Sequence, residues 1–275
     1  MTIDSHQHFW SYGKAEYPWI PEGTPLHRDW LPEDLSALQK PLGVDGSVAV
    51  QARQTVEESR WLLTLADHDP RIKAVVGWAD LRSEAIEEQL AELAKHPRFR
   101  GVRHVVQDET DDRFMQGAGF RRGIRALQTH GLTYDVLIQA KQLPSAIELV
   151  REFPEQPFVL DHIAKPAIKA AGIEPWKSQI RELAKSPNLM CKVSGLVTEA
   201  DQKNWKAADL QPYLDVVFEC FGPERLMWGS DWPVCLLAAG YERVYQVVAD
   251  YTGQLSATDR SAIFGGNCAR FYGIK

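Results

Sequence analysis

The sequence lacks several patterns that would assign it to a class at once. Its 275 residues contain only four cysteines, which lie far apart and form no CxxC pair, so neither a zinc finger nor a redox motif is expected. No apolar run approaches the roughly 18 residues of a membrane span. The first residues show no basic segment followed by an apolar one, which argues against a signal peptide. We therefore expect a cytoplasmic protein with no membrane association.

The chain also lacks a concentration of positive charge. Its 31 Lys and Arg residues against 37 Asp and Glu give a formal net charge of −6, and the basic residues are scattered. Without a basic stripe, a nucleic-acid partner is not expected. There is no internal repeat, low-complexity tract or interdomain linker. With 44% hydrophobic residues the composition is globular, and we expect one domain over residues 1–275, with homo-oligomerisation left open.

What the sequence does contain is an alternation of short apolar runs with amphipathic stretches. Such runs favour a parallel sheet that is buried on both faces. The runs predict eight strands, over Ile3–His8, Gly46–Gln51, Ala74–Asp80, Gly101–Val106, Leu132–Ile138, Phe158–Ile163, Leu189–Leu196 and Arg225–Asp231.

Helical patterns separate these strands. Thr55 and Glu58 are spaced as a capping box, and Ser256 is a second candidate N-cap ahead of a last helix. Helical spacing or stop signals predict further helices over Ala85–Ala94, Gly119–His130, Ser145–Phe153 and Leu210–Phe221. Eight strands alternating with helices predict an α/β fold of the (β/α)8 TIM-barrel type. The competing doubly wound sheet usually carries a glycine-rich phosphate turn after an early strand, and none is found.

The segment from Trp10 to Trp30 has a different character. It follows the first predicted strand, is rich in aromatic residues and proline, and shows no helical period. A loop this long is usually functional or disordered, and its aromatic content argues against disorder. We expect an ordered lid over the barrel mouth, in which Trp30 and its neighbours cover the apolar face of a substrate.

The chemistry of a barrel is carried at the carboxyl ends of its strands. The first strand ends in His6 and His8, which are two residues apart and so lie on one face of the strand. His162 ends the sixth strand and Asp231 the eighth. Three imidazoles and one carboxylate form a plausible zinc set with room for water. Zinc lowers the pKa of its water to about 7, which makes hydroxide available at neutral pH.

Other polar side chains near strand ends are candidates for substrate binding. The cations and Gln51 would hold a carbonyl, hydroxyls or a carboxylate, although an internal structural role is the alternative for each. Since adjacent residues of a strand alternate, only one of Arg103 and His104 is expected to face the mouth. The candidates are Gln51, Arg53, Arg103, His104, Lys165 and Lys192.

Motifs spread along the chain resemble the amidohydrolase superfamily, and more narrowly its branch of metal-dependent hydrolases that includes sugar lactonases. They are Asp4–Trp10, Val50–Ala52, Gly77–Leu81, Gly101–His104, Asp161–Pro166, Lys192–Leu196 and Gly229–Pro233.

The resemblance implies a distorted barrel that hydrolyses a cyclic ester, with metal ligands at His6, His8, His162 and Asp231. The sequence departs from two-metal members, because strand four lacks a bridging ligand and strand five offers Asp135 in place of a histidine. One divalent ion, Zn²⁺, is therefore expected at most. Some relatives of this branch work without a metal, so a metal-independent reaction stays open.

The expected reaction opens a sugar lactone, such as L-fucono-lactone or a related aldonolactone. Asp231 and His162 are the expected catalytic residues, with Asp231 taking a proton from water and returning it to the ring oxygen. Two alternatives remain at this stage. One is a decarboxylase of a small unsaturated acid on the same scaffold, and the other is a non-catalytic protein that binds a small molecule.

Overall fold

The computed structural model describes residues 1–275 and contains one sheet of eight parallel strands in sequence order. A parallel bridge between Gln7 and Trp232 brings the first and last strands together, so the sheet is nearly closed. The strands are β1 (Ile3–Gln7), β2 (Gly46–Val50), β3 (Ile72–Gly77), β4 (Phe99–Val105), β5 (Thr133–Leu137), β6 (Phe158–Leu160), β7 (Leu189–Val193) and β8 (Leu226–Trp228). The predicted (β/α)8 barrel is confirmed.

All eight predicted strands exist, but every one of them ends earlier than predicted. Beyond Leu160 the backbone enters a tight turn, Asp161–Ala164, in which His162, Ile163 and Ala164 are left-handed. Beyond Val193 it leads into the short helix α7 (Leu196–Glu199). The pattern of buried residues continues past these ends, because the loops at the mouth are themselves buried. Hydrophobicity alone therefore does not mark where pairing stops.

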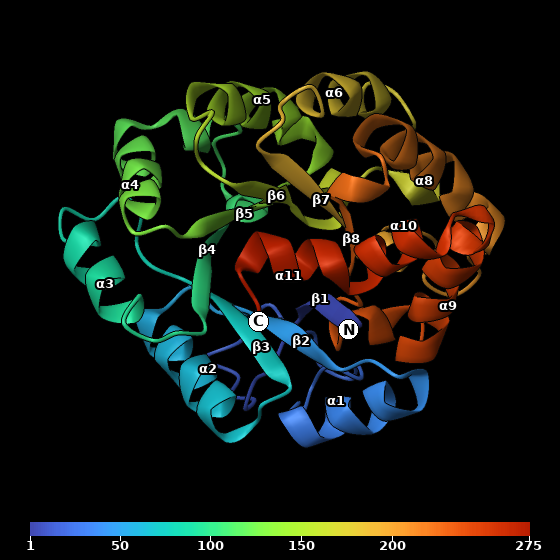
Figure 1. Cartoon of the computed structure of the whole chain (residues 1–275), viewed down its shortest axis with the longest axis horizontal. Coiled ribbons are helices and arrows are strands. Elements are labelled where there is room, and N and C mark those ends of the chain that lie inside the picture. The colour runs from blue at the N-terminus through green and yellow to red at the C-terminus, as the bar shows by residue number, and fades with distance from the viewer.

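Helices surround the barrel, as Figure 1 shows. Every predicted helix is present, with shifted ends, as α2 (Val56–His68), α3 (Ile86–Leu93), α4 (Ala118–Thr129), α5 (Leu143–Glu152), α8 (Ala207–Phe221) and α10 (Ala257–Ser261). Besides the short α7, four helices were not predicted. They are α1 (Pro32–Gln39), α6 (Trp176–Leu183), α9 (Tyr241–Tyr251) and α11 (Asn267–Tyr272). No helix is long and apolar enough to cross a membrane.

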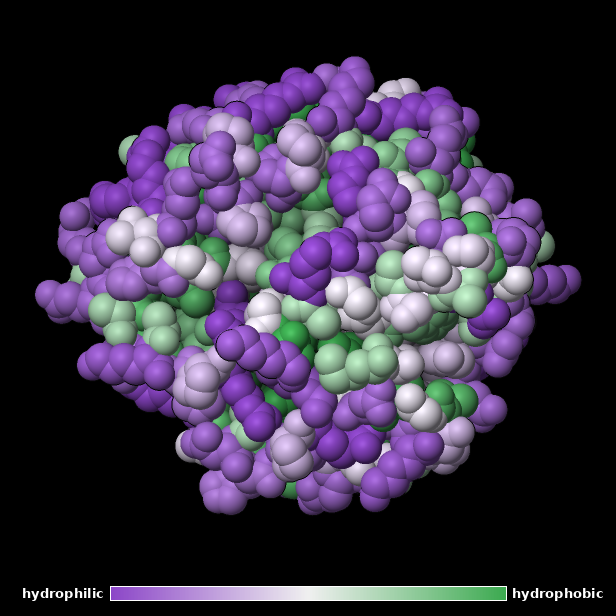
Figure 2. All heavy atoms as spheres, in the orientation of Figure 1, coloured by the Kyte–Doolittle hydropathy of each residue, from purple (hydrophilic) through white to green (hydrophobic).

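The α11 helix lies across one end of the barrel, beside both chain termini (Figure 1). Its Cys268 and Tyr272 pack with Ile3 and with inward-facing residues of β2, β3, β6, β7 and β8. Figure 2 shows this face, where hydrophilic residues dominate the rim and hydrophobic ones gather nearer the centre. The end with the strand amino termini is thus covered, which leaves the opposite, carboxyl end for a site.

Candidate active site

Four side chains meet at the carboxyl end of the barrel. The Nε2 atoms of His6, His8 and His162 lie 3.8, 3.5 and 3.7 Å from Oδ1 of Asp231. His6 and His8 are 3.2 Å apart between their Nε2 atoms. All four residues are buried, with exposed fractions of 4% or less. The structure therefore brings together the whole set that the sequence predicts.

Backbone conformation explains how the later strands deliver their residues. His162 and Asp231 have left-handed φ angles of 53° and 58°, which cost non-glycine residues roughly 1–3 kcal/mol each. Asp231 is held there by its amide hydrogen bond to the carbonyl of His6, at 2.8 Å. Gly195 packs against the His162 ring, where an added Cβ would lie 2.7 Å from Nδ1. The strained, left-handed backbone at these two turns directs the side chains of His162 and Asp231 into the barrel mouth.

In each of the three histidines Nδ1, the ring nitrogen that does not face Asp231, has its own partner. Nδ1 of His8 lies 2.8 Å from the carbonyl of Val50, and Nδ1 of His162 lies 2.9 Å from Oγ of Ser194. Nδ1 of His6 faces a carboxylate oxygen of Asp161 at 3.4 Å. For His8 and His162, a proton on Nδ1 leaves the Nε2 lone pair free, and this is how metal-binding histidines are commonly oriented. His6 differs, because Arg103 lies 3.2 Å from its Nε2.

Burial and charge set the protonation states of the cluster. Burial is the main cause that lowers the pKa of His6 and His8, and it lowers that of His162 to about 4. Burial opposes ionisation of Asp231, but His162 and the hydrogen bond from His8 outweigh it and hold the Asp231 pKa below its usual range. At neutral pH the site thus holds neutral imidazoles and a carboxylate, the forms that bind metal ions.

The spacing of three of these atoms, from His6, His8 and Asp231, also fits one divalent ion. Zinc bonded to nitrogen and oxygen at 2.0–2.1 Å in a tetrahedron requires ligand atoms about 3.3–3.4 Å apart. The separations of 3.2–3.8 Å around Asp231 are close to that value. A second group, His6, Asp161 and His162, is also compact enough for an ion. Its Asp161 is already paired with Arg103 and Lys192, so the group of His6, His8 and Asp231 is the better cage. His162 approaches this group through Asp231, at 3.7 Å.

A network of buried charges lies against His6. Nζ of Lys192 lies 2.5 Å from Asp135, 3.1 Å from Asp161 and 3.2 Å from Nδ1 of His6. Arg103 is 3.2 Å from the second oxygen of Asp161 and also donates to the carbonyl of Gln51. Tyr272 of α11 donates to Asp135 at 2.8 Å. Two cations face two carboxylates, so the charges compensate one another.

This network changes how two sequence candidates are interpreted. Lys192 is fully buried, and its ammonium contacts carboxylates and His6. Arg103 is 4% exposed, with its guanidinium committed to Asp161, His6 and Gln51. Both lie where they position His6 and Asp161. Their positions near strand ends predict that they lie close to the site, but the sequence pattern gives no indication of how deeply they are buried.

His104 faces away from the mouth, as the alternation along β4 requires. Its Nε2 lies 2.7 Å from Glu109, its Nδ1 accepts from Trp78, and its ring stacks on Phe114 at 4.8 Å. These contacts fill the space between the barrel and its helices. Of the pair predicted from the sequence, Arg103 is therefore the residue that faces the interior.

A further carboxylate, which the sequence analysis did not single out, ties the two ends of the sheet together. Asp4 accepts from the amide and hydroxyl of Ser230 at 2.8 and 2.6 Å, and from Tyr241 at 3.1 Å. Burial raises its pKa to about 6 against these hydrogen bonds. Since Ser230 precedes Asp231, this contact fixes the turn that carries the cluster carboxylate.

Three other predicted residues lie round the mouth. Arg53, in the loop after β2, makes no side-chain hydrogen bond or ion pair. Lys165 is 3.7 Å from Glu199, with both side chains partly exposed. Gln51 is buried and donates to the carbonyl of Arg103, while its own side-chain oxygen has no partner. Arg53 and Gln51 therefore keep hydrogen-bonding capacity for a ligand.

The segment from Trp10 to Trp30 is an ordered loop. Trp10 and Trp30 exchange two backbone hydrogen bonds, of 3.0 and 2.9 Å, which close the loop at its base. Trp30 is only 9% exposed and packs edge-on against Trp232, beside Asp231. Trp19 is 42% exposed. Trp30 thus packs between the loop and the barrel, and Trp19 is the exposed aromatic side chain of the loop.

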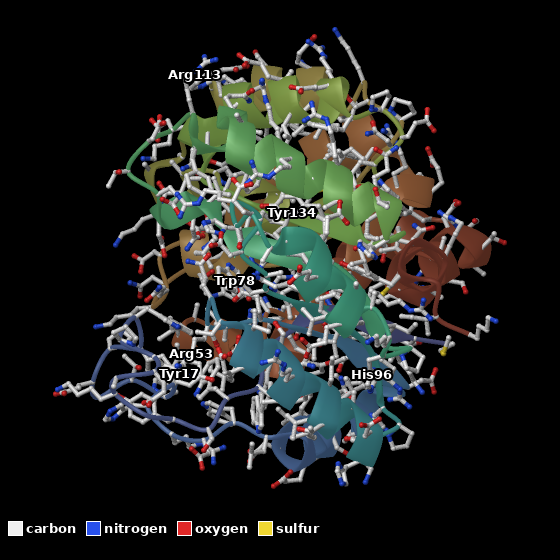
Figure 3. All side chains as sticks on the ribbon, turned by 90° about the vertical axis from the view of Figure 1, so that its left-hand side faces the viewer. Tyr17, Arg53, Trp78, His96, Arg113 and Tyr134 are labelled. Atoms are coloured by element: carbon white, nitrogen blue, oxygen red, sulfur yellow. The ribbon has the colours of Figure 1, made fainter.

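Glu58 fastens this loop to the barrel. Its carboxylate accepts from the amides of Ala52 and Arg53 at 3.0 and 2.7 Å and from the hydroxyl of Tyr17 at 3.1 Å. Figure 3 shows Tyr17 and Arg53 close together, at the opposite end of the molecule from His96, which precedes β4. The predicted capping box is therefore only half right. Thr55 accepts from the Glu58 amide at 3.2 Å, but the Glu58 carboxylate turns to the loop instead.

Glu58 should make stability depend on pH. Burial raises its pKa from 4.5 to about 7, although its backbone hydrogen bonds oppose this. The folded state then binds more protons than the unfolded state between these values, so stability falls as pH rises through that window. In Glu58→Gln this loss is absent. We expect the free energy of unfolding of the variant, minus that of wild type, to rise by up to about 3 kcal/mol from pH 4.5 to 7.

Urea denaturation at half-unit pH steps measures this difference. Glu57→Gln is the matched control, because the neighbouring Glu57 side chain is 75% exposed. A difference that stays constant with pH would show that Glu58 keeps an ordinary pKa.

The fold and the site together define a class of protein. It is a barrel enzyme with three histidines and one aspartate buried at the carboxyl end, where the side chains suit a divalent cation. The profile of the amidohydrolase family matches residues 3–274. An L-fucono-1,5-lactonase from Burkholderia multivorans is 45% identical, with 100% of this chain and 96% of that protein covered. A second L-fucono-1,5-lactonase, from Burkholderia ambifaria, is 38% identical with the same coverage.

Among solved structures, a Burkholderia multivorans amidohydrolase with bound Zn is 45% identical over the full length of both chains, with a TM-score of 0.96. The chain belongs to the amidohydrolase family, and the resemblance predicted from its motifs is confirmed.

Proposed function

We propose that this protein hydrolyses a sugar lactone, such as L-fucono-lactone or a related aldonolactone, to the aldonic acid. The full-length similarity to two L-fucono-1,5-lactonases supports this substrate class. The reaction type rests on one observation, the convergence of three imidazole nitrogens on the Asp231 carboxylate within 3.8 Å. We expect the reaction to take place in the cytoplasm.

Asp231 carries the proton in this proposal. Its carboxylate takes a proton from water as the water oxygen attacks the lactone carbonyl. When the bond from the carbonyl carbon to the ring oxygen breaks, Asp231 returns the proton to that oxygen, and the product is a hydroxy acid. A divalent cation held by His6, His8, His162 and Asp231, which we propose to be Zn²⁺, would supply positive charge that makes water more acidic and stabilises the oxyanion.

The residues round the mouth would hold the substrate. Arg53 offers an unpaired guanidinium to the carbonyl or to the product carboxylate, to which it can donate two parallel hydrogen bonds. Gln51 offers its unpartnered oxygen to a hydroxyl. The loop based on Trp10 and Trp30 would cover the sugar ring, with Trp19 as its exposed aromatic side chain.

A panel of five- and six-membered sugar lactones with a pH indicator tests the proposal, because opening a lactone releases acid. We expect at least one aldonolactone to be opened with saturable kinetics. Release of carbon dioxide from a small unsaturated acid, without lactone turnover, would favour the decarboxylase alternative. That alternative has less support, since both relatives named above are lactonases.

Removal of metal provides a separate prediction. After treatment with a chelator and confirmation by elemental analysis, we expect lactone hydrolysis to fall at least about tenfold, because ligation and the extra positive charge are lost. Stoichiometric Zn²⁺ should restore it. Full activity in metal-free protein would show that the four residues work without an ion.

A further inference from the structure

One ion pair stands at the rim of the mouth, outside the buried network. Lys165 follows β6 three residues after His162, and Glu199 is the last residue of α7, which follows β7. Nζ of Lys165 and Oε1 of Glu199 are 3.7 Å apart, and the two side chains are 23% and 27% exposed. Loops that follow parallel strands all open on the carboxyl face of a barrel. The pair is therefore accessible from the side on which the cluster lies.

The contact between the two groups is loose. At 3.7 Å it is longer than a hydrogen bond, whereas Lys192 meets its carboxylates at 2.5 and 3.1 Å. Neither the ammonium of Lys165 nor the carboxylate of Glu199 makes another side-chain hydrogen bond. An ammonium offers three donors and a carboxylate about four acceptor positions. The pair thus keeps free donors and acceptors side by side.

The backbone is strained where it positions Lys165. His162, Ile163, Ala164 and Lys165 have φ angles of 53°, 49°, 61° and 46°, a run of four left-handed residues without glycine. Backbone strain of this kind concentrates at functional sites. The turn that delivers His162 to the cluster also carries Lys165 to the rim. The two side chains are therefore placed by the same piece of chain.

The charge of the cluster also acts on Glu199. Burial raises the pKa of Glu199, the charge of Lys165 opposes this rise, and the negative charge of Asp231 adds to it.

We propose that Lys165 and Glu199 recognise two neighbouring hydroxyl groups on the ring of the lactone, and that they determine its specificity for polyhydroxylated substrates. Lys165 donates to one hydroxyl oxygen while Glu199 accepts from the next hydroxyl. This inference rests on the proposed lactonase function and adds Glu199, which the sequence analysis did not single out. Two hydroxyls on adjacent ring carbons can offer an oxygen that accepts from Lys165 and an O–H that donates to Glu199, side by side as the two residues are. A ring without hydroxyls would offer neither Lys165 nor Glu199 a hydrogen bond.

The size of the effect follows from how such sites discriminate. A site built to hydrogen-bond a hydroxyl rejects an analogue without it by up to about 10⁴–10⁵-fold when it is fully buried. Because Lys165 and Glu199 are about one quarter exposed, water replaces part of the lost contact. We therefore expect a preference of about 10- to 100-fold from this pair.

The test compares Glu199→Gln, Lys165→Met and the double variant with wild type. The quantity is the ratio of kcat/KM for a sugar lactone to kcat/KM for δ-valerolactone, which has the same ring without hydroxyls. We expect this ratio to fall about 10- to 100-fold in each variant, mainly through a higher KM for the sugar lactone. A ratio that stays within twofold of wild type overturns the proposal, whatever happens to the individual rates.

Two controls complete the kinetic test. The double variant removes both charges, so it guards against an effect of leaving one of them unpaired. Lys185→Met removes an exposed ion pair, at 2.6 Å, between Lys185 just after the outer helix α6 and Glu182 within it, and should leave the ratio unchanged.

A binding measurement separates this inference from the proposed function. Calorimetry compares the affinity of each protein for the aldonate of the sugar lactone with that for 5-hydroxypentanoate, and needs no turnover. Wild type should bind the aldonate at least tenfold more tightly, and the variants should lose that preference. If wild type shows the preference but opens no lactone, the proposed function fails and the inference stands. If wild type opens sugar lactones but shows no preference, the inference fails alone.

Discussion

Asp231→Asn is expected to lower kcat for lactone hydrolysis by at least about 10³-fold, because it removes both the proton acceptor and one ligand from the cluster. Asn has the same shape but cannot take the proton from water. The Asp231 amide bond to His6 is made by the backbone, so the turn should persist. Steady-state kinetics measure the loss, and circular dichroism with thermal unfolding checks the fold.

Asp80→Asn is the matched control for this experiment. Asp80 lies just beyond β3, and its carboxylate accepts the amide of Arg82 at 3.1 Å, with no role in the cluster. This variant should keep its activity within about threefold of wild type. If Asp231→Asn retained activity within about tenfold of wild type, another group would have to carry the proton.

Lys192→Met should have the largest effect on stability. It leaves Asp135 without a cation and Asp161 with Arg103 alone, in a fully buried setting. Removing one partner of a buried ion pair typically costs about 3–5 kcal/mol, since the remaining charge is uncompensated. Urea denaturation measures the free energy of unfolding. A loss below about 1 kcal/mol would indicate that Asp135 takes up a proton at little cost.

A double variant tests the physical reason. Lys192→Met combined with Asp135→Asn removes one charge of each sign, so the losses should be non-additive by at least about 1 kcal/mol. Lys185→Met is the surface control and should cost less than about 0.5 kcal/mol. Additive losses in the double variant would mean that Lys192 and Asp135 are not coupled.

The positions of the cluster residues were predictable because a barrel has only one place for them. The two-residue spacing of His6 and His8 fixes their common face, and the rule that strand ends carry the chemistry brings His162 and Asp231 to the same region. Alternation also predicts that only one of Arg103 and His104 points inward. It does not apply to Asp161 and His162, because β6 ends at Leu160 and the turn beyond it sends both side chains inward.

The sequence could not show how deeply a side chain is buried, or which residues far apart in the chain contact each other. Lys192 is a strand residue like others, and only the register places its ammonium beneath His6. Glu58 was assigned to a helix cap from local spacing, yet its partner Tyr17 is 41 residues away. Such contacts depend on how the loops cross the barrel mouth, and local patterns carry no information about that crossing.

The paired backbones of Trp10 and Trp30 have a consequence for how substrate range can change. Because both ends of the loop are fixed to each other, residues 11–29 can vary in length and side chains while the barrel keeps its strand register. The loop is then an exchangeable segment above the cluster of His6, His8, His162 and Asp231. Transplanting it between homologous lactonases offers a direct route to enzymes that prefer a different sugar ring.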